Sequence, residues 1–536
     1  MTSARPYPPL ITVLLSPGAY PEASSIHRIE IAETHISWVL LVGEHAYKIK
    51  KPVRMGFLDF STLELRKRFC HEELRLNHRY SPELYLEVLA ITGSADAPRM
   101  GGTGSAIEYA LKMRRFPSAF SFDRMADAHR LFPEHVTALA KVIAEFHQEI
   151  RPEPSIHAPF AKECIDAYVE ANFSAIDRQL VRTEDHSTLN ALHEWTNREN
   201  QRLQDVFLAR ASAGFVRECH GDLHLGNIVL LHGCPRLYDG IEFNPDLRWI
   251  DTMNEIAFTV MDLEARGLPN LAYLFLNHYL EISGDYRGIE LLDYYRLYRA
   301  MVRAKVAMIR REQTQNPLEQ ASLLNQGLNY LNYGLRLIRE KAPCLLITHG
   351  YSGSGKSCLA EQLAAMLPAI RIRSDVERKR PYGRSVSYGP EATHQVYGQL
   401  MELAAVILPC GHDVILDATF LKRGHRALAR QVAETTGATF GILDCQASVE
   451  TLEHRLAIRS KEGGDPSDAD PEVLDQQLKN AEPWGEDELR FVLRIDIENH
   501  PQPAELASLC SLLHAPSVRP TIASQPSGPP SNSGMG

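Results

Sequence analysis

The hydrophobic positions in the C-terminal part of the chain, from Ala342 to about Leu513, fall in short apolar segments separated by amphipathic stretches. Short apolar segments that alternate with a helical repeat of apolar positions are typical of buried strands connected by helices. The expected strands lie at Cys344–Thr348, Asp413–Leu416, Thr439–Leu443 and Phe491–Ile495. This alternation predicts an α/β domain with a parallel sheet covered by helices.

The pattern differs in the N-terminal part of the chain. Consecutive strands are expected between Ile29 and Lys50, followed by a helix at Leu63–His78 and more strand through Ile107–Met113. From Arg124 to Glu340 the pattern is mainly helical, apart from a strand-rich patch at Asn227–Phe243. A small β-rich lobe ahead of a larger helical lobe is an α+β arrangement.

These two patterns divide the chain into domains. A length of 536 residues exceeds what one hydrophobic core supports. We expect an N-terminal segment at 1–28, an α+β domain at 29–338 and an α/β domain at 342–514, with the boundary near Ile338–Pro343. Residues 515–536 are Pro, Ser and Gly with almost no large apolar side chain, which predicts a disordered tail.

Composition and charge narrow the classes of protein. A net charge of −10 argues against a broad nucleic-acid-binding surface, which needs an excess of Lys and Arg, although a local basic groove stays open. The nine cysteines stand singly without a CxxC pair, which is typical of reduced thiols. The apolar stretch Leu10–Leu15 is too short for a signal sequence, and no segment has the roughly 20 apolar residues that span a bilayer. A cytoplasmic protein is therefore expected.

One glycine-rich segment carries a phosphate-binding motif. It follows an expected strand, precedes a helix expected to begin near Cys358, and fits GxxxxGK[ST]. Glycines allow a tight turn whose N–H groups face phosphate oxygens at a helix N-terminus. In this Walker A motif the lysine would reach the β- and γ-phosphates of ATP and the final serine would hold Mg²⁺. The expected nucleotide-binding residues are Gly350, Ser352, Gly353, Ser354, Gly355, Lys356 and Ser357.

Residues downstream of this motif indicate a kinase that acts on a small molecule. Asp375 follows the next strand and can accept the proton of an attacking hydroxyl, with Arg378 steadying the acceptor; its alternative role is a helix N-cap. Asp417 ends an apolar strand, the usual place for a carboxylate that binds Mg²⁺ through water, or else is a turn residue. Arg455 and Arg459, four apart on one helical face, would close over the phosphoryl group, or else form a solvated face.

With these residues in view, the segment resembles the polynucleotide-kinase, gluconate-kinase and zeta-toxin group of P-loop kinases. The resemblance rests on the P-loop, the DxxR at Asp375–Arg378, the ILDAT strand at Ile415–Thr419 and the Arg-bearing helix, and covers roughly a third of the chain. It implies a five-stranded parallel sheet and ATP-dependent phosphorylation of a hydroxyl group. The acceptor is not carried over, because acceptors in this group range from sugars to nucleic-acid ends.

A second motif, His220-Gly-Asp-Leu-His-Leu-Gly-Asn227, lies in the N-terminal part of the chain. An Asp and an Asn five positions apart on one loop can divide the work of phosphoryl transfer. Asp222 would orient and deprotonate an acceptor hydroxyl, while Asn227 would bind Mg²⁺. Asp239 ends a strand twelve residues further on, where a second metal-binding carboxylate is needed.

This motif resembles the aminoglycoside-phosphotransferase and choline-kinase branch of the protein-kinase-like fold. The resemblance implies that Lys48, in Ala46-Tyr47-Lys48, contacts the α- and β-phosphates and forms an ion pair with Glu73. Lys50 and Glu72 are the nearest competitors for these two roles. It also implies that Tyr109–Pro117 is the hinge that contacts adenine.

Three features depart from that family pattern. Thr34-His35-Ile36-Ser37 stands where a glycine-rich loop is expected. Glu242, in Asp239-Gly-Ile-Glu242, can take the metal-binding role given to Asp239. Gly221 replaces the arginine of protein kinases, which favours a metabolite kinase over a protein kinase.

Taken together, the chain resembles bacterial two-domain proteins described as bifunctional aminoglycoside-phosphotransferase-like/ATP-binding proteins. The favoured interpretation is a transferase with two ATP-Mg²⁺ sites acting on hydroxyls of small molecules. One alternative is a regulatory protein with a nucleotide switch and a non-catalytic kinase-like domain. Another is a kinase of nucleic-acid ends, which fits poorly with the net charge. The sequence indicates neither acceptor nor oligomeric state.

Overall fold

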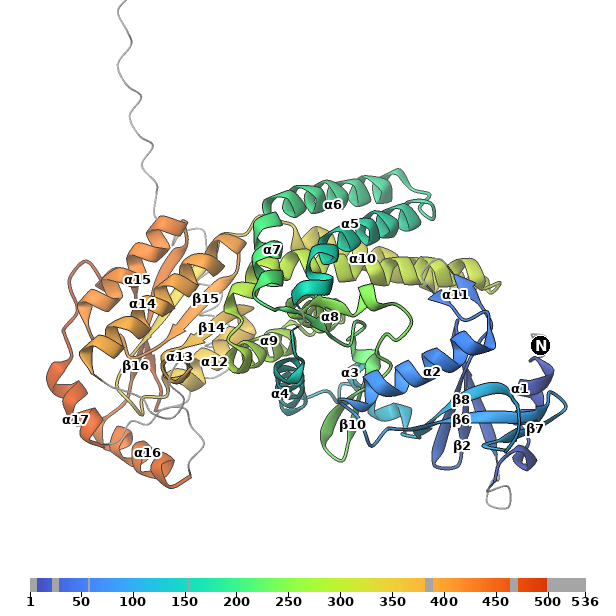
Figure 1. Cartoon of the computed structure of the whole chain (residues 1–536). Coiled ribbons are helices and arrows are strands. Elements are labelled where there is room, and N and C mark those ends of the chain that lie inside the picture. Colours follow the sequence, from blue (N-terminus) through green and yellow to red (C-terminus); the bar gives the residue numbers. More distant parts are fainter. Residues whose placement is uncertain are drawn as a thin grey trace, which may run out of the picture. The chain divides into compact units, whose positions relative to one another are not determined.

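The computed structural model divides the chain into two compact units, Met1–Arg339 and Glu340–Gly536 (Figure 1). The structure describes residues 7–21, 28–55, 58–152, 154–380, 389–462 and 471–498. The tail expected at 515–536 lies outside these residues. No helix within the described ranges has the length and apolar composition needed to span a bilayer.

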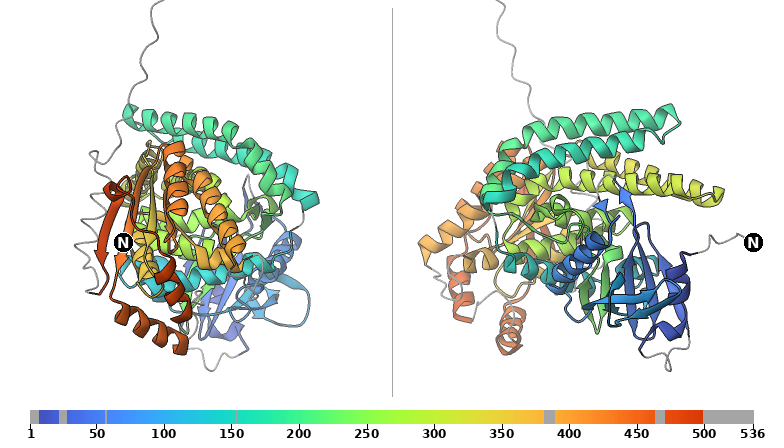
Figure 2. Two further views of the ribbon diagram at one scale, coloured as in Figure 1. Left: turned by 90° about the vertical axis from the view of Figure 1, so that its left-hand side faces the viewer. Right: turned by 45° about the vertical axis from the view of Figure 1, so that its right-hand side comes forward.

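An antiparallel sheet with strand order β1-β2-β3-β8-β6-β7 forms the β lobe of the N-terminal unit. Helix α2 packs against strands β6 and β8 of this sheet, as the views in Figure 2 show. The helix spans Leu63–His78, the bounds expected from the sequence, and Thr62 caps it by accepting a hydrogen bond from the Leu65 N–H. The strands are β1 (Ile29–Glu33), β2 (Ser37–Val42), β3 (His45–Lys50), β6 (Tyr85–Ser94), β7 (Ala97–Met100) and β8 (Ala106–Arg114), with a small pair β4 (Arg54–Met55) and β5 (Leu58–Asp59).

The segment near the start of the chain joins the core of the β lobe. Helix α1 (Pro9–Leu14) buries Ile11 and Leu14 in the same hydrophobic cluster as Trp38 and Leu40 of β2. The sequence predicts a separate segment at residues 1–28. The described helix of this segment instead belongs to the same compact unit as the β lobe, because its apolar side chains are buried in the core of that lobe.

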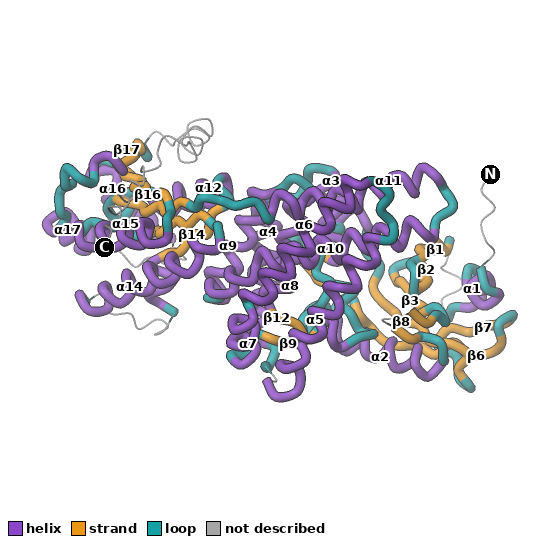
Figure 3. Tube along the Cα trace, turned by 90° about the horizontal axis from the view of Figure 1, so that it is seen from above, coloured by secondary structure: helices purple, strands orange, loops and turns teal. Residues whose placement is uncertain are grey.

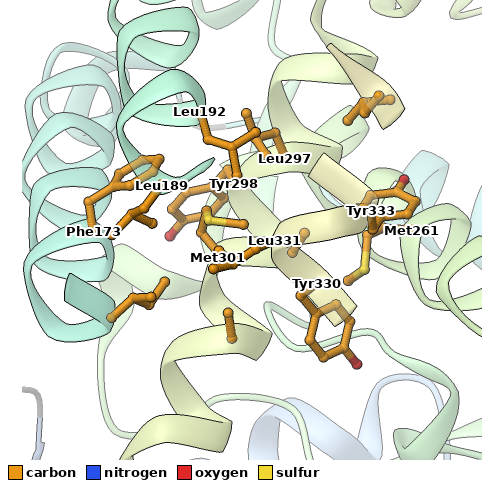
Figure 4. Close-up of a cluster of buried hydrophobic side chains, with 14 of the residues drawn as sticks. Phe173, Leu189, Leu192, Met261, Leu297, Tyr298, Met301, Tyr330, Leu331 and Tyr333 are labelled. Atoms are coloured by element: carbon orange, nitrogen blue, oxygen red, sulfur yellow. The ribbon is translucent and has the colours of Figure 1, made fainter. Parts of the chain in front are cut away.

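The helical lobe is built around helix α8 (Thr252–Ala265), in which every residue from Thr252 to Leu263 is buried. Around it lie α3 (Phe122–Asp127), α4 (Pro133–Glu149), α5 (Pro154–Asp177), α6 (Thr183–Arg202), α7 (Gln204–Ser212), α9 (Pro269–Ser283), α10 (Ile289–Gln313) and α11 (Pro317–Leu337). Figure 4 shows side chains of α5, α6, α8, α10 and α11 meeting in one apolar cluster. The strand-rich patch forms one short antiparallel pair, β10 (Ile228–Leu231) with β11 (Cys234–Leu237). A second pair, β9 (Val216–Glu218) with β12 (Trp249–Asp251), is formed by segments before and after the patch.

The C-terminal unit contains a five-stranded parallel sheet with order β14-β15-β13-β16-β17. Its central strands are almost continuously apolar and buried, as strands covered on both faces require. Figure 3 shows strands of this sheet lying between helices. The strands are β13 (Cys344–His349), β14 (Ala369–Arg373), β15 (Asp413–Asp417), β16 (Thr439–Gln446) and β17 (Val492–Asp496), and the helices α12 (Lys356–Met366), α13 (Ser374–Lys379), α14 (Pro390–Ile407), α15 (Arg423–Thr436), α16 (Val449–Glu462) and α17 (Pro471–Asn480).

Strand pairing brings two expected functional segments together. Strands β13 and β15 are direct parallel neighbours, with Ile347 opposite Leu416. Their carboxyl ends therefore lie side by side. The phosphate-binding motif follows β13, and Asp417 is the last residue of β15.

Candidate functional sites

The phosphate loop of the C-terminal unit, residues 350–357, needs glycine at three positions. Gly350, Gly353 and Gly355 have φ values of 141°, 86° and 78°. A side chain on Gly350 would approach the Cys445 carbonyl oxygen to 2.7 Å, and one on Gly355 would approach Ile497 to 2.5 Å. Gly355 is the left-handed N-cap residue of α12, so the helix begins at Lys356 instead of near Cys358. The loop N–H groups thus lie at the positive end of a helix, as anion binding requires.

Lys356 and Ser357, the last two residues of this loop, make polar contacts with the loop itself and with Asp417. The Lys356 ammonium donates to the Tyr351 carbonyl oxygen at 2.6 Å and lies 3.5 Å from the Ser354 hydroxyl. The Ser357 hydroxyl donates to one carboxylate oxygen of Asp417 at 3.1 Å. Burial raises the pKa of Asp417, and its second oxygen is buried without a hydrogen bond, 3.5 Å from Arg373. A hydroxyl and a carboxylate here fit Mg²⁺ bound directly and through water, and Asp417 is not a solvated turn residue.

Asp375, Arg378 and Arg455 line a cavity of about 520 Å³ together with the phosphate loop. Asp375 stands in the first turn of α13, whose N-cap residue is Arg373, so Asp375 is not the cap. Arg378 donates to the Thr393 hydroxyl at 3.4 Å. Arg455 donates to the carbonyl oxygens of Gly353 and Ile497 at 3.4 and 3.3 Å, which contradicts a solvated basic face. The side chain of Arg459 lies outside the described part of the chain.

Sequence reasoning missed two groups that line this cavity. Gln477 of α17 accepts from the Ser352 N–H at 2.8 Å and donates to the Ser352 hydroxyl at 3.0 Å. Tyr397 of α14 stacks on His425 of α15, with ring centroids 3.9 Å apart. No local motif marks these residues, because each contact joins separate segments: Gln477 lies 125 positions from Ser352, and Tyr397 and His425 lie on successive helices.

The second candidate site, in the N-terminal unit, centres on the buried carboxylate of Glu73. One of its oxygens accepts from Lys48 and the other from Lys50, each at 2.6 Å. Lys48 also forms an ion pair with Asp239, and Lys50 forms one with Glu242. Lys48 and Lys50 are two positions apart on β3, so both side chains leave the same face of the strand. The two lysines that competed for one role in the sequence therefore share the same partner.

Electrostatics stabilise the ionised forms of Glu73 and Lys48, whereas burial raises the pKa of Glu242. Burial alone would raise the pKa of Glu73, but the charges of Lys48 and Lys50 lower it to about 2. Burial opposes the charge of Lys48, but Asp239, Glu73 and Glu242 raise its pKa well above the usual range. Glu72, the competitor of Glu73, instead pairs with Arg75 and Arg248.

Asp222 and Asn227 lie together in the loop that follows β9. The Asn227 amide donates to the Asp222 backbone carbonyl at 2.9 Å and to its carboxylate at 3.1 Å. Burial would raise the pKa of Asp222, but the nearby His224, Arg303 and His220 hold it well below the usual range. The carboxylate is thus ionised at neutral pH.

Side chains of helix α8 form hydrogen bonds with the backbone of this loop and hold it in place. Glu255 accepts hydrogen bonds from the N–H groups of His220 and Gly221 at 3.1 and 2.7 Å. One and two turns further along, Thr259 donates to the Leu223 carbonyl at 2.8 Å, and Asp262 accepts from the Leu225 N–H at 2.9 Å. This i, i+4, i+7 spacing lies on one helix face, so a single buried face sets the position of Asp222.

Asp239 and Glu242, the two candidate metal-binding acids, differ in how exposed their side chains are. Asp239 has a left-handed backbone, with φ of 64°, and its N–H donates to the Tyr85 hydroxyl at 2.8 Å. Its side chain is 48% exposed, whereas that of Glu242 is 4% exposed and paired with Lys50. Asp239 is therefore the acid that a ligand can reach.

The turn that replaces a glycine-rich loop is closed by its own hydrogen bonds. Between β1 and β2, the Thr34 N–H donates to the Ser37 carbonyl at 2.9 Å and the Thr34 hydroxyl accepts from the Ser37 N–H at 2.9 Å. Two of the N–H groups in this turn are thus occupied within the protein. The expected hinge segment Tyr109–Pro117 begins in β8 and continues past its end at Arg114.

Comparison with known proteins supports the assignment of the C-terminal unit. Residues 345–484 match the family described as AAA domain, a range that includes the phosphate loop, Asp375 and Asp417. Together with the loop geometry, this match defines a P-loop nucleotide-binding domain on a parallel sheet.

The chain is also similar to two mycobacterial proteins and to solved structures of kinases. Uncharacterized proteins of Mycobacterium tuberculosis and Mycobacterium bovis are 29% identical over 456 residues, 83% of this chain and 88% of theirs. A sugar kinase of Janibacter sp. HTCC2649 covers 33% of this chain and 99% of its own at 22% identity and a TM-score of 0.27. An ethanolamine kinase of Plasmodium vivax covers 59% and 83% at 10% identity and a TM-score of 0.37.

Replacing Lys50 by Met should strongly destabilise the N-terminal unit. It leaves Glu242 buried without a cation and removes one partner of Glu73, a loss of roughly 3–5 kcal/mol in the free energy of unfolding. Lys112→Met, which breaks a 3.3 Å pair with the half-exposed Glu87 in the same sheet, should cost about 0–1 kcal/mol. Urea denaturation followed by circular dichroism measures both, and equal losses would contradict the network described above.

Replacing Gly355 by Ala should weaken nucleotide binding in the C-terminal unit. The left-handed backbone alone costs about 1–3 kcal/mol for a non-glycine residue, and the added carbon meets Ile497. We expect a loss of affinity for ATP-Mg²⁺ of about tenfold or more by calorimetry. Gly424→Ala, in open space on α15, is the matched control and should bind as wild type. Unchanged binding by Gly355→Ala would refute the assignment of the loop.

Proposed function

We propose that this chain is an ATP-dependent phosphotransferase with two nucleotide sites, one in each unit, that act on hydroxyl groups of small molecules. One recurring arrangement carries the proposal. In each unit a buried lysine lies beside a carboxylate suited to Mg²⁺: Lys356 with the Ser357–Asp417 pair, and Lys48 with Asp239. Phosphoryl transfer needs these two kinds of group to neutralise the triphosphate.

In the C-terminal site, the cavity beside the phosphate loop would hold the acceptor. Asp375 would orient the acceptor hydroxyl and accept its proton, while Arg378 steadies the acceptor. Arg455, with Arg459 further along α16, would balance charge on the transferring phosphoryl group. Mg²⁺, held by Ser357 and Asp417, would neutralise the phosphate oxygens when bound.

In the N-terminal site, the ionised Asp222 would orient an acceptor hydroxyl. Asn227 and Asp239 are the groups that would bind Mg²⁺, and Lys48 would contact the phosphates. Glu73 holds Lys48 in place, and Glu242 serves this network through Lys50 instead of binding metal. Most of the rate enhancement would come from positioning and electrostatics, because the transferring group needs little covalent chemistry from the protein.

The acceptors are proposed only as a class, hydroxylated metabolites. The net charge of −10 disfavours nucleic-acid ends as the acceptor. Cytoplasmic residence and independent turnover at both sites are part of the same proposal.

A second candidate function is a nucleotide-dependent regulator whose N-terminal unit binds a ligand without turnover. The observation that favours it is the turn between β1 and β2, whose N–H groups at Thr34 and Ser37 are occupied by internal hydrogen bonds. A glycine-rich loop would instead offer its N–H groups to phosphates. The ionised Asp222 beside Asn227 favours catalysis.

ATP turnover with a panel of sugars, sugar acids and amino alcohols tests the proposal. With the right acceptors present, Asp222→Ala should abolish one activity and Lys356→Ala the other, each by about a hundredfold or more, because each removes a group that acts in the transition state. Asp96→Ala, in the exposed β6–β7 turn, and Lys141→Ala, exposed on α4, are matched controls for charge loss.

The two candidate functions give different results in this assay. Turnover lost only in Lys356→Ala would support the regulatory function. If calorimetry detects no ATP-Mg²⁺ binding to the intact protein, both functions are wrong.

A further inference from the structure

Gln477 holds the outer edge of the phosphate loop from a helix that is distant in the sequence. Its amide oxygen accepts from the Ser352 N–H at 2.8 Å, and its amide nitrogen donates to the Ser352 hydroxyl at 3.0 Å. A backbone N–H can only donate, so these contacts fix which end of the amide faces which atom. Ser352 itself is 7% exposed. Gln477 therefore contacts both the backbone N–H and the hydroxyl of one loop residue.

Apolar contacts hold this glutamine in place. Leu474 and Leu478, which flank Gln477 on α17, pack in one cluster with Leu452 and Leu456 of α16. Tyr351, the residue before Ser352, packs against the same cluster. Helix α17 and the phosphate loop thus contact one shared apolar cluster, which holds Gln477 beside the loop.

Gln477 stands at the end of the loop where the terminal phosphate is expected. The Lys356 ammonium donates to the carbonyl of Tyr351, adjacent to Ser352. A P-loop holds the α- and β-phosphates with its backbone N–H groups and reaches the β- and γ-phosphates with its lysine. The γ-phosphate therefore belongs on the lysine side of the loop, near Tyr351 and Ser352. Gln477 and Arg455 both line the cavity at this place.

The glutamine amide keeps one donor for a ligand. Each amide has two hydrogens, and Ser352 takes one of them. Within the described ranges, no protein acceptor binds the second hydrogen of Gln477. An oxygen in the cavity can accept it.

We propose that Gln477 is a specificity-determining residue that distinguishes a nucleoside triphosphate from a diphosphate by donating to the terminal phosphate. The inference rests on the proposed nucleotide site of the C-terminal unit. Two bonds to Ser352 preorganise the amide, so little side-chain entropy is lost when the phosphate binds. A neutral amide donates without the repulsion that a carboxylate at this position would impose on the phosphate.

Binding of a non-hydrolysable ATP analogue and of ADP, each with Mg²⁺, tests this inference on the intact protein. Calorimetry would follow the binding component that Lys356→Ala removes, which isolates the C-terminal site. Gln477→Leu should weaken the ATP analogue by about tenfold, the usual effect of losing a hydrogen bond to a charged group. ADP affinity should change by less than about twofold, because its terminal β-phosphate keeps the loop N–H groups and Lys356.

Two further variants sharpen the result. Gln477→Glu keeps the size and helix propensity of the residue but adds a negative charge, so it should weaken the ATP analogue more than Gln477→Leu does. Gln431→Leu, at an exposed position on α15 that does not line the cavity, should leave both affinities unchanged.

Equal weakening of both nucleotides by Gln477→Leu would overturn the inference, because it would show that Gln477 only stiffens the loop. Unchanged binding of both would overturn it as well. A wild-type protein without the component that depends on Lys356 would instead refute the proposed nucleotide site itself, and the inference with it.

Discussion

The N-terminal unit depends on the bonding of one buried carboxylate. Glu73 is fully buried, and an unpaired charge at such a depth would cost several kcal/mol. Its two oxygens form ion pairs with Lys48 and Lys50. Lys48 forms a second ion pair with Asp239, and Lys50 forms a second one with Glu242. Strand β3, helix α2 and the loop after β11 are thus joined by a single charge network, and removal of Glu73 would take one ion-pair partner from each lysine.

The two candidate sites solve the same electrostatic problem with different parts of the chain. In the C-terminal unit, the proposed phosphate site consists of backbone N–H groups that a short contiguous loop supplies at the start of α12. In the N-terminal unit, the proposed site consists of side chains from segments up to 191 residues apart, the separation of Lys48 and Asp239. A contiguous loop needs little beyond its own glycines, whereas a gathered site depends on the surrounding packing.

This difference explains what the sequence could and could not predict. Strand, loop, helix, Lys356 and Ser357 are adjacent in the chain, so their spacing predicts their geometry. The pairing of Lys48 with Glu73 came from resemblance to a family, and the sequence left Lys50 as a competitor. Both lysines pair with one acid because alternation along β3 places their side chains on the same face of the strand and because both side chains are buried.

Other features left no signal in the sequence at all. Gln477 lies 125 residues from Ser352, and a glutamine on an amphipathic helix is ordinarily a solvated residue. Helix α1 is too short for its periodicity to distinguish a core element from an N-terminal extension.

Asp375 and Asp417 were placed at strand ends by pattern, and the structure adds the cavity that Asp375 lines and the hydrogen bond that Asp417 accepts.

Helix α8 has a consequence for motion. The N–H groups of His220, Gly221 and Leu225 donate to Glu255 and Asp262, side chains of a helix buried in the middle of the lobe. A backbone amide exchanges its hydrogen with water only when its bond opens. These loop amides are thus tied to the slowest opening events of the helical lobe, and the loop that carries Asp222 should behave as part of the rigid interior although it lies between secondary-structure elements.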